Sequence, residues 1–168
     1  MIIGLISDTH RLLREEVRDN LKDCHLILHA GDIGNLDVID NLNKIAKTEV
    51  ILGNVDKNID KKTILNEKII EVMGKRIYLI HDISKISIDL KKENIDIVVY
   101  GHSHKSNIYE KDGILYINPG SVGPKRFKLP TTMAKLFIKD KIISDEYNED
   151  LTNNIFNFKN CMVKFITI

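Results

Sequence analysis

The sequence predicts an α/β fold in which two mixed β-sheets pack as a sandwich with helices outside. Over roughly the first third of the chain, short apolar runs alternate with segments of helical apolar spacing, as in parallel β-α-β units. After residue 104, one apolar run follows another across turn residues, as in antiparallel sheets. At 168 residues the chain suits one well-cored domain, and we expect a single domain over residues 1–168.

The amino-terminal part alternates strands with helices. We expect strands at Ile2–Ser7, His25–Ala30 and Glu49–Leu52, because each is a short apolar run that ends in polar residues. Apolar residues at helical spacing predict one helix over about residues 11–22 and another over about 36–45. Crossovers of this kind bring the carboxyl ends of parallel strands to one edge of a sheet, where open α/β folds bind ligands.

The rest of the chain is richer in strands, with one further helix expected at Ile83–Glu93. Turn residues predict three hairpins, the last of them joining 132–138 to 142–147. Asparagines make Asn148–Asn160 look like a loop or a poor helix, and Cys161–Ile168 fits a final strand. The strands expected here are Lys68–Met73, Arg76–Ile80, Ile95–Tyr100, Ser106–Glu110, Ile114–Asn118, Thr132–Ile138 and Ile142–Tyr147.

Composition narrows the function classes. A net charge of +1 without a basic block argues against general nucleic-acid binding, although a nucleotide substrate stays open. No segment fits a signal peptide or a membrane span, and Cys24 and Cys161 form no redox or zinc motif, so we expect a cytoplasmic protein without a membrane partner. A homo-oligomer stays open as well, because an apolar strand at the tail could pair with a second copy across a dimer edge.

Metal-binding side chains follow five separate apolar runs. Each has an ordinary explanation alone, since Asp and Asn cap helices and His packs in cores. Five such coincidences at one sheet edge are much less probable, and the donor set is four imidazoles, two carboxylates and one amide oxygen. The residues are Asp8, His10, Asp32, Asn54, His81, His102 and His104.

The donor count predicts two divalent ions. If Asp32 bridges, seven side chains supply eight contacts, which leaves room for a water shared by ions roughly 3.5–4 Å apart. The site would keep a positive charge of about +2 and so attract a phosphate ester anion. A ligand set of imidazole and carboxylate without thiolate suits manganese, nickel, zinc, iron or cobalt better than magnesium or calcium alone. We expect manganese first, with magnesium still open.

The ordered motifs resemble those of the calcineurin-like metallophosphoesterase superfamily, and the flanking residues resemble its small YfcE-type phosphodiesterase branch. The resemblance covers roughly residues 2 to 147. The motifs are Ser7-Asp8-Thr9-His10, Leu28-His29-Ala30-Gly31-Asp32-Ile33, Gly53-Asn54-x-Asp56, His81, Gly101-His102-x-His104 and Asn118-Pro119-Gly120-Ser121.

The resemblance implies a four-layer α/β/β/α sandwich and hydrolysis of a small or activated phosphodiester by a metal-bridging hydroxide. His10 and His102 would help to position the phosphoryl oxygens, and Asp56 would hold a neighbouring ligand. Many members carry a proton-donating His where this chain has Val55, so a modest rate is expected. The implied ligand sets are Asp8, His10, Asp32 and His104 for one ion, and Asp32, Asn54, His81 and His102 for the other.

Several polar residues near these motifs allow two interpretations. Arg11 either grips a substrate phosphate or starts the first helix. Asp82 is better explained as a cap than as a partner of His81. His25 and His29 are expected to be structural. A solvated loop is the default for the basic cluster, although the cluster could recruit a nucleotide backbone; its residues are Lys125, Arg126 and Lys128.

Two other functions stay open. The retromer small subunit shares the implied fold and serves as a non-catalytic interaction scaffold, but it lacks the full ligand set that is present here. A phosphomonoesterase or protein phosphatase is disfavoured, because this chain has neither a His at position 55 nor long substrate loops.

Overall fold

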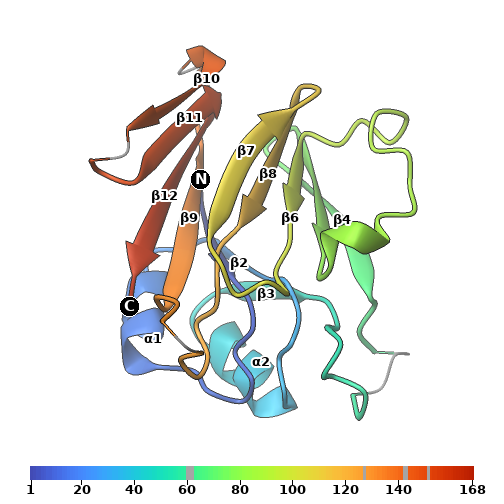
Figure 1. Cartoon of the computed structure of the whole chain (residues 1–168), viewed down its shortest axis with the longest axis vertical. Helices are drawn as coiled ribbons and strands as arrows, with labels where there is room; N and C mark the ends of the chain where they lie inside the picture. Colours follow the sequence, from blue (N-terminus) through green and yellow to red (C-terminus); the bar gives the residue numbers. More distant parts are fainter. Residues whose placement is uncertain (60–62, 127, 142–143, 151) are drawn as a thin grey trace.

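In the computed structural model, which describes residues 1–59, 63–126, 128–141, 144–150 and 152–168, two β-sheets face each other (Figure 1). The seven-stranded sheet has the order β10-β11-β12-β9-β1-β2-β3, and the five-stranded sheet has the order β4-β5-β6-β8-β7. Both contain parallel and antiparallel pairs, so the predicted pair of mixed sheets is confirmed.

The first sheet consists of β1 (Ile2–Ile6), β2 (Leu26–His29), β3 (Lys47–Val50), β9 (Thr132–Ile138), β10 (Ser144–Asp150), β11 (Ile155–Lys159) and β12 (Cys161–Thr167). The second sheet consists of β4 (Glu67–Val72), β5 (Lys75–Ile80), β6 (Ile97–Val99), β7 (Asn107–Lys111) and β8 (Ile114–Asn118).

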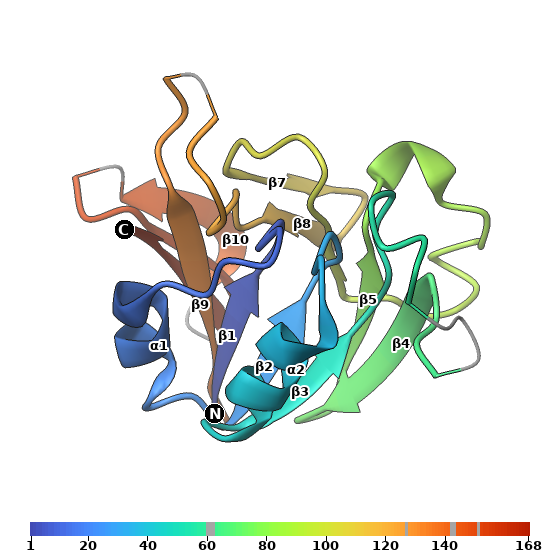
Figure 2. The same cartoon turned by 90° about the horizontal axis from the view of Figure 1, so that it is seen from below.

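Helices cover the outer face of the first sheet. Helix α1 (Glu15–Leu21) and helix α2 (Leu36–Asn43) lie on the same side of β1, β2 and β3 (Figure 2). Their buried residues pack against that face, whereas the opposite face contributes Leu5 and Leu28 to the core between the sheets. The apolar strand residues therefore place both helices outside the sandwich.

The outer face of the second sheet is covered differently. The prediction of a helix at Ile83–Glu93 is wrong, because only the 3-10 turn η1 (Ile83–Lys85) forms there. Asp82 and Asp89 accept hydrogen bonds from backbone N–H groups two or three residues further on, which offers the chain turns in place of a helix. The apolar spacing still fulfils its packing role, because Ile86 and Leu90 contact the outer core cluster.

Helix α1 also starts later than expected. The spacing predicted a start near residue 11, but His10 and Arg11 have φ angles of 45° and 74°, which are left-handed rather than helical. Arg14, with extended backbone, is the N-cap residue. Arg11 therefore does not start the helix.

The carboxyl-terminal part corrects two further expectations. Within the stretch 148–160, expected as a loop or a poor helix, residues 148–150 belong to β10 and residues 155–159 to β11, and the two strands pair antiparallel. The predicted hairpin of 132–138 with 142–147 is wrong, because β12 pairs with β9 while β10 pairs with β11. The structure does not describe residues 142–143, where the expected strand starts. Backbone pairing in the sheet outweighs the weak strand propensity of Asn.

The final strand is confirmed at β12, which has strand neighbours on both edges, β9 and β11. It is therefore not a free edge for pairing with a second copy. Among the described residues, no helix is long and apolar enough to cross a membrane.

Candidate metal centre

Five strand ends meet at one edge of the sandwich, as the topology predicted. Strands β1, β2 and β3 run parallel in one sheet, and β5 and β6 run parallel in the other. The residues that follow their carboxyl ends are Asp8 and His10 after β1, Asp32 after β2, Asn54 after β3, His81 after β5, and His102 and His104 after β6.

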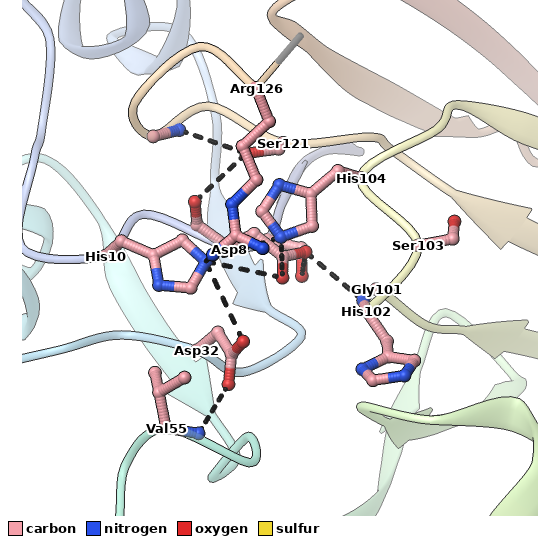
Figure 3. A network of polar contacts seen from close by, with 12 residues as sticks. Asp8, His10, Asp32, Val55, Gly101, His102, Ser103, His104, Ser121 and Arg126 are labelled. Atoms are coloured by element: carbon pink, nitrogen blue, oxygen red, sulfur yellow. Dashed lines mark hydrogen bonds and ion pairs between the residues drawn. The ribbon is translucent and has the colours of Figure 1, made fainter. Parts of the chain in front are cut away.

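The first cluster consists of Asp8, His10, Asp32 and His104, each of which offers a donor atom within 4.8 Å of the other three (Figure 3). His10 Nε2 lies 3.4 Å from His104 Nε2 and 3.8 Å from Asp32 Oδ2. His104 Nε2 is 3.2 Å from Asp8 Oδ1. Possible ligand atoms of four side chains thus surround one small volume.

This cluster fits a divalent ion. Within the described part of the chain, Asp8 Oδ1 is buried and accepts no hydrogen bond, although unsatisfied buried oxygens are costly. The other oxygen of the carboxylate, Oδ2, is held by the Ser7 hydroxyl at 2.6 Å and the His102 N–H at 3.2 Å. The carboxylate is therefore oriented with one free oxygen toward the cluster, as a metal ligand requires.

The second cluster consists of Asn54, His81 and His102 together with the other oxygen of Asp32. Asn54 Oδ1 lies 3.0 Å from His81 Nε2 and 3.1 Å from His102 Nδ1. Asp32 Oδ1 is 3.5 Å from His81 Nε2. All seven predicted side chains are therefore brought together, and Asp32 faces both clusters.

Burial and mutual contacts shift the pKa values of Asp32, His81 and His10. Burial opposes the charge of Asp32, but hydrogen bonds with His81 and from the Val55 N–H, with nearby imidazoles, lower its pKa to about 2. Burial also opposes the charge of His81, yet Asp32, the Ala30 carbonyl and Asp8 leave its pKa raised. His81 Nδ1 donates to the Ala30 carbonyl at 2.7 Å, so Nε2 is the atom available for a metal. Burial, assisted by Arg126 and His104, lowers the pKa of His10 against the pull of Asp32 and Asp8.

The backbone at the site is strained. Asp8, Asp32, His102 and His104 have φ angles of 56°, 56°, 70° and 59°, in the left-handed region that side chains larger than glycine seldom adopt. Such conformations cost about 1–3 kcal/mol each and cluster at functional sites. Close approach also matters, because a Cβ atom at Gly53 would overlap the Asp32 carboxylate.

Asp56 holds together the loops that carry the two clusters. It is buried, and its carboxylate accepts three backbone N–H groups, from Ile33 at 3.1 Å, Gly34 at 2.8 Å and Gly53 at 2.8 Å. These hydrogen bonds tie the loop that carries Asp32 to the loop that carries Asn54. Asp56 thus contacts backbone, where the resemblance implied contact with a ligand side chain.

The sequence analysis missed several hydrogen bonds that hold the loops of the site in place. Thr9 Oγ1 lies 2.9 Å from His29 Nε2, and Ser121 donates to the Asp8 carbonyl at 3.1 Å. Asn118 donates to the Gly101 carbonyl at 2.8 Å. The Asn118-Pro119-Gly120-Ser121 motif was the only signal of the last two contacts.

The polar residues near the motifs have different contacts in the structure. Asp82 is a cap, since it accepts from the Ser84 N–H at 3.0 Å. His25 and His29 bind backbone N–H groups and have structural roles, as predicted. Arg11 Nε donates to the Gly34 carbonyl at 3.3 Å. Arg126 departs from the solvated-loop default, because its Nη2 lies 3.3 Å from His10 Nε2.

A cavity of about 700 Å³ opens beside the second cluster. Asn54 and His81 line this cavity together with the apolar side chains of Leu52, Leu65 and Ile80. A volume of this size is in the usual range for small-molecule sites.

Histidine, aspartate and asparagine side chains that converge at the strand ends of an α/β sandwich make a candidate metal-binding site of the kind used in phosphoryl chemistry. The chain belongs to the calcineurin-like phosphoesterase superfamily, whose domain model matches residues 1–141. The predicted family is confirmed.

Two curated proteins of Methanocaldococcus jannaschii are similar to this chain. A probable metallophosphoesterase is 34% identical over 151 residues, which cover 84% of this chain and 78% of that protein. A phosphodiesterase is 31% identical over 140 residues, which cover 71% of this chain and 83% of that protein.

Solved structures share the fold. Vps29 from Entamoeba histolytica, complexed with Zn²⁺, has a TM-score of 0.69 at 21% identity and covers 99% of both chains. The phosphoesterase YfcE from E. coli has a TM-score of 0.63 at 20% identity, covering 84% of this chain and 90% of that chain. At these identities the likeness concerns the fold alone.

Proposed function

We propose that the protein hydrolyses a small or activated phosphodiester at a centre that holds two divalent ions. The observation that carries the proposal is the convergence of seven side chains from five strand ends on two adjoining clusters. Membership of a phosphoesterase family makes hydrolysis of a phosphate ester the expected chemistry.

Asp32 would bridge the two ions. Its Oδ2 lies 3.8 Å from His10 Nε2 in the first cluster, and its Oδ1 lies 3.5 Å from His81 Nε2 in the second. The Val55 N–H at 3.0 Å from Oδ1 fixes the plane of the carboxylate. One carboxylate can therefore serve two positions without reorienting.

The remaining ligands would divide between the ions. Asp8, His10 and His104 would complete the first position, and Asn54, His81 and His102 would complete the second. When bound, divalent ions supply Lewis acidity and an activated water as the nucleophile at phosphorus. The imidazole-rich set without thiolate favours manganese, with nickel, zinc, iron, cobalt and magnesium as alternatives.

Three observations favour a diester over a monoester. A 31% identical relative is named a phosphodiesterase. Val55 stands where many family members carry a proton-donating His, so good leaving groups are favoured. The cavity lined by Asn54 and His81 has room for a second ester group. His10 and the half-exposed His102 would orient the phosphoryl oxygens.

A non-catalytic scaffold is the second candidate, favoured by the fold that this chain shares with Vps29. Elemental analysis of the purified protein, combined with assays on bis-p-nitrophenyl phosphate, cyclic nucleotides, dinucleotides and matched monoesters, separates the candidates. An inert, metal-free protein would favour the scaffold, and a preference for monoesters would favour a phosphomonoesterase.

The decisive variant is Asp32→Asn. Removing the shared charge should lower kcat/KM on bis-p-nitrophenyl phosphate by about 10³-fold or more and reduce bound Mn²⁺, because both positions lose an anionic ligand. Asp40→Asn, at an exposed position on α2, is the matched control. Wild-type turnover by Asp32→Asn would refute the two-ion centre.

A further inference from the structure

Arg126 reaches the first cluster from a loop outside the predicted ligand set. It lies between β8 and β9, and its Nη2 is 3.3 Å from His10 Nε2. Figure 3 shows the guanidinium lying over the cluster beside His10 and His104. The residue is exposed, so this position is not imposed by burial.

The contact competes with a metal ion. A guanidinium can only donate hydrogen bonds, so the His10 atom that accepts from it must use its single lone pair. The same Nε2 faces Asp8 Oδ1 at 4.0 Å, Asp32 Oδ2 at 3.8 Å and His104 Nε2 at 3.4 Å. An ion bound among these atoms would take that lone pair and release Arg126.

The loop keeps Arg126 near the site after such a release. Arg14 Nη2 donates to the Gly123 carbonyl at 3.1 Å, and the Val122 N–H donates to the Ser7 carbonyl at 3.2 Å. On the other side, the Leu129 N–H donates to the Arg126 carbonyl at 3.1 Å. The side chain can turn, whereas its backbone stays anchored to the tip of β1.

We propose that Arg126 is a phosphate-binding residue that rests on His10 in the metal-free protein and pairs with a non-bridging phosphoryl oxygen once metal is bound. A released guanidinium beside bound cations needs an anion, and its planar fork matches phosphate. This substrate role rests on the proposed function, whereas the competition with metal concerns only the first cluster.

The test compares Arg126→Gln with Lys125→Gln, which removes the same charge from the preceding residue of the loop. Titration calorimetry with Mn²⁺ should show tighter binding to Arg126→Gln, by about two- to tenfold beyond the control, because a competing hydrogen bond is lost. Inorganic phosphate should bind the Mn²⁺-loaded variant about 10- to 100-fold more weakly than the loaded control. Arg126→Lys keeps the charge without the fork and should fall between the two.

The outcomes separate this inference from the proposed function. If wild type binds Mn²⁺ and hydrolyses diesters but Arg126→Gln matches Lys125→Gln in both titrations, the role of Arg126 is refuted and the proposed function stands. If wild type binds neither Mn²⁺ nor any of the alternative divalent ions named above, both are refuted. If wild type binds Mn²⁺ and phosphate as expected but hydrolyses no ester, the proposed function fails while the anion site stands.

Discussion

The two clusters, which form the halves of the candidate metal centre, differ in how tightly the fold encloses them. In the first cluster, Asp8, Asp32 and His104 are buried, and two carboxylates supply charge. In the second cluster, His102 has a 49% exposed side chain and Asn54 is exposed beside the cavity. An enclosed cluster with two carboxylates suits a firmly held ion, whereas an open cluster that has only the shared Asp32 carboxylate suits an ion that exchanges and meets the substrate.

The sharpest test of this difference compares Asp8→Ala with Asn54→Ala. We expect Asp8→Ala to lower kcat/KM by about 10³-fold, because a buried charged ligand is lost from the enclosed cluster. Asn54→Ala should cost about 10- to 100-fold and recover partly as Mn²⁺ is raised, because only a neutral ligand is lost. Metal content and activity across a Mn²⁺ titration measure both. Equal losses with equal recovery would contradict the comparison.

Asp56 joins the loops of the two halves, so its replacement should lower the free energy of unfolding. In Asp56→Asn an amide replaces an oxygen that accepts backbone N–H groups, and we expect a loss of about 2–4 kcal/mol in the free energy of unfolding. Urea unfolding in the presence of a chelator measures this, with Asp40→Asn as the control. A variant as stable as Asp40→Asn would show that the three hydrogen bonds contribute little.

His29 makes the enclosed half sensitive to acid. Burial lowers its pKa to about 4, against an unfolded value of 6.5, so the unfolded chain takes up a proton that the folded chain refuses. The stability from neutral His29 is complete above pH 6.5 and declines toward pH 4, by at most about 1.4 kcal/mol per pH unit.

The variant His29→Gln should be less stable than wild type at pH 7 and should lose less stability between pH 6.5 and 4. Chemical unfolding in a chelator at several pH values measures this. His25, which is exposed and directly precedes β2, provides the control His25→Gln, which should keep the wild-type slope. Parallel curves for wild type and His29→Gln would assign the acid sensitivity elsewhere.

Local sequence patterns predicted some strands and helices correctly and others wrongly. Apolar runs located the strands that carry the site, and Gly74 marked the hairpin between β4 and β5. The same rules failed at 83–93, where aspartate side chains stabilise turns, and at 148–160, where β11 pairs with both β10 and β12 and β12 joins them to β9. Propensity describes single residues, whereas a sheet stabilises whole strands by pairing them.

The donors of the candidate centre can be predicted from the amino-acid sequence, because each stands directly after an apolar run and parallel strands end at one edge. The tertiary structure sets how these donors are used. It orients Asp8 Oδ1, aligns both oxygens of Asp32, binds Asp56 to three backbone N–H groups and brings Arg126 to His10. These are contacts between loops far apart in sequence, and their geometry is set by packing and by strained backbone angles that no local pattern encodes.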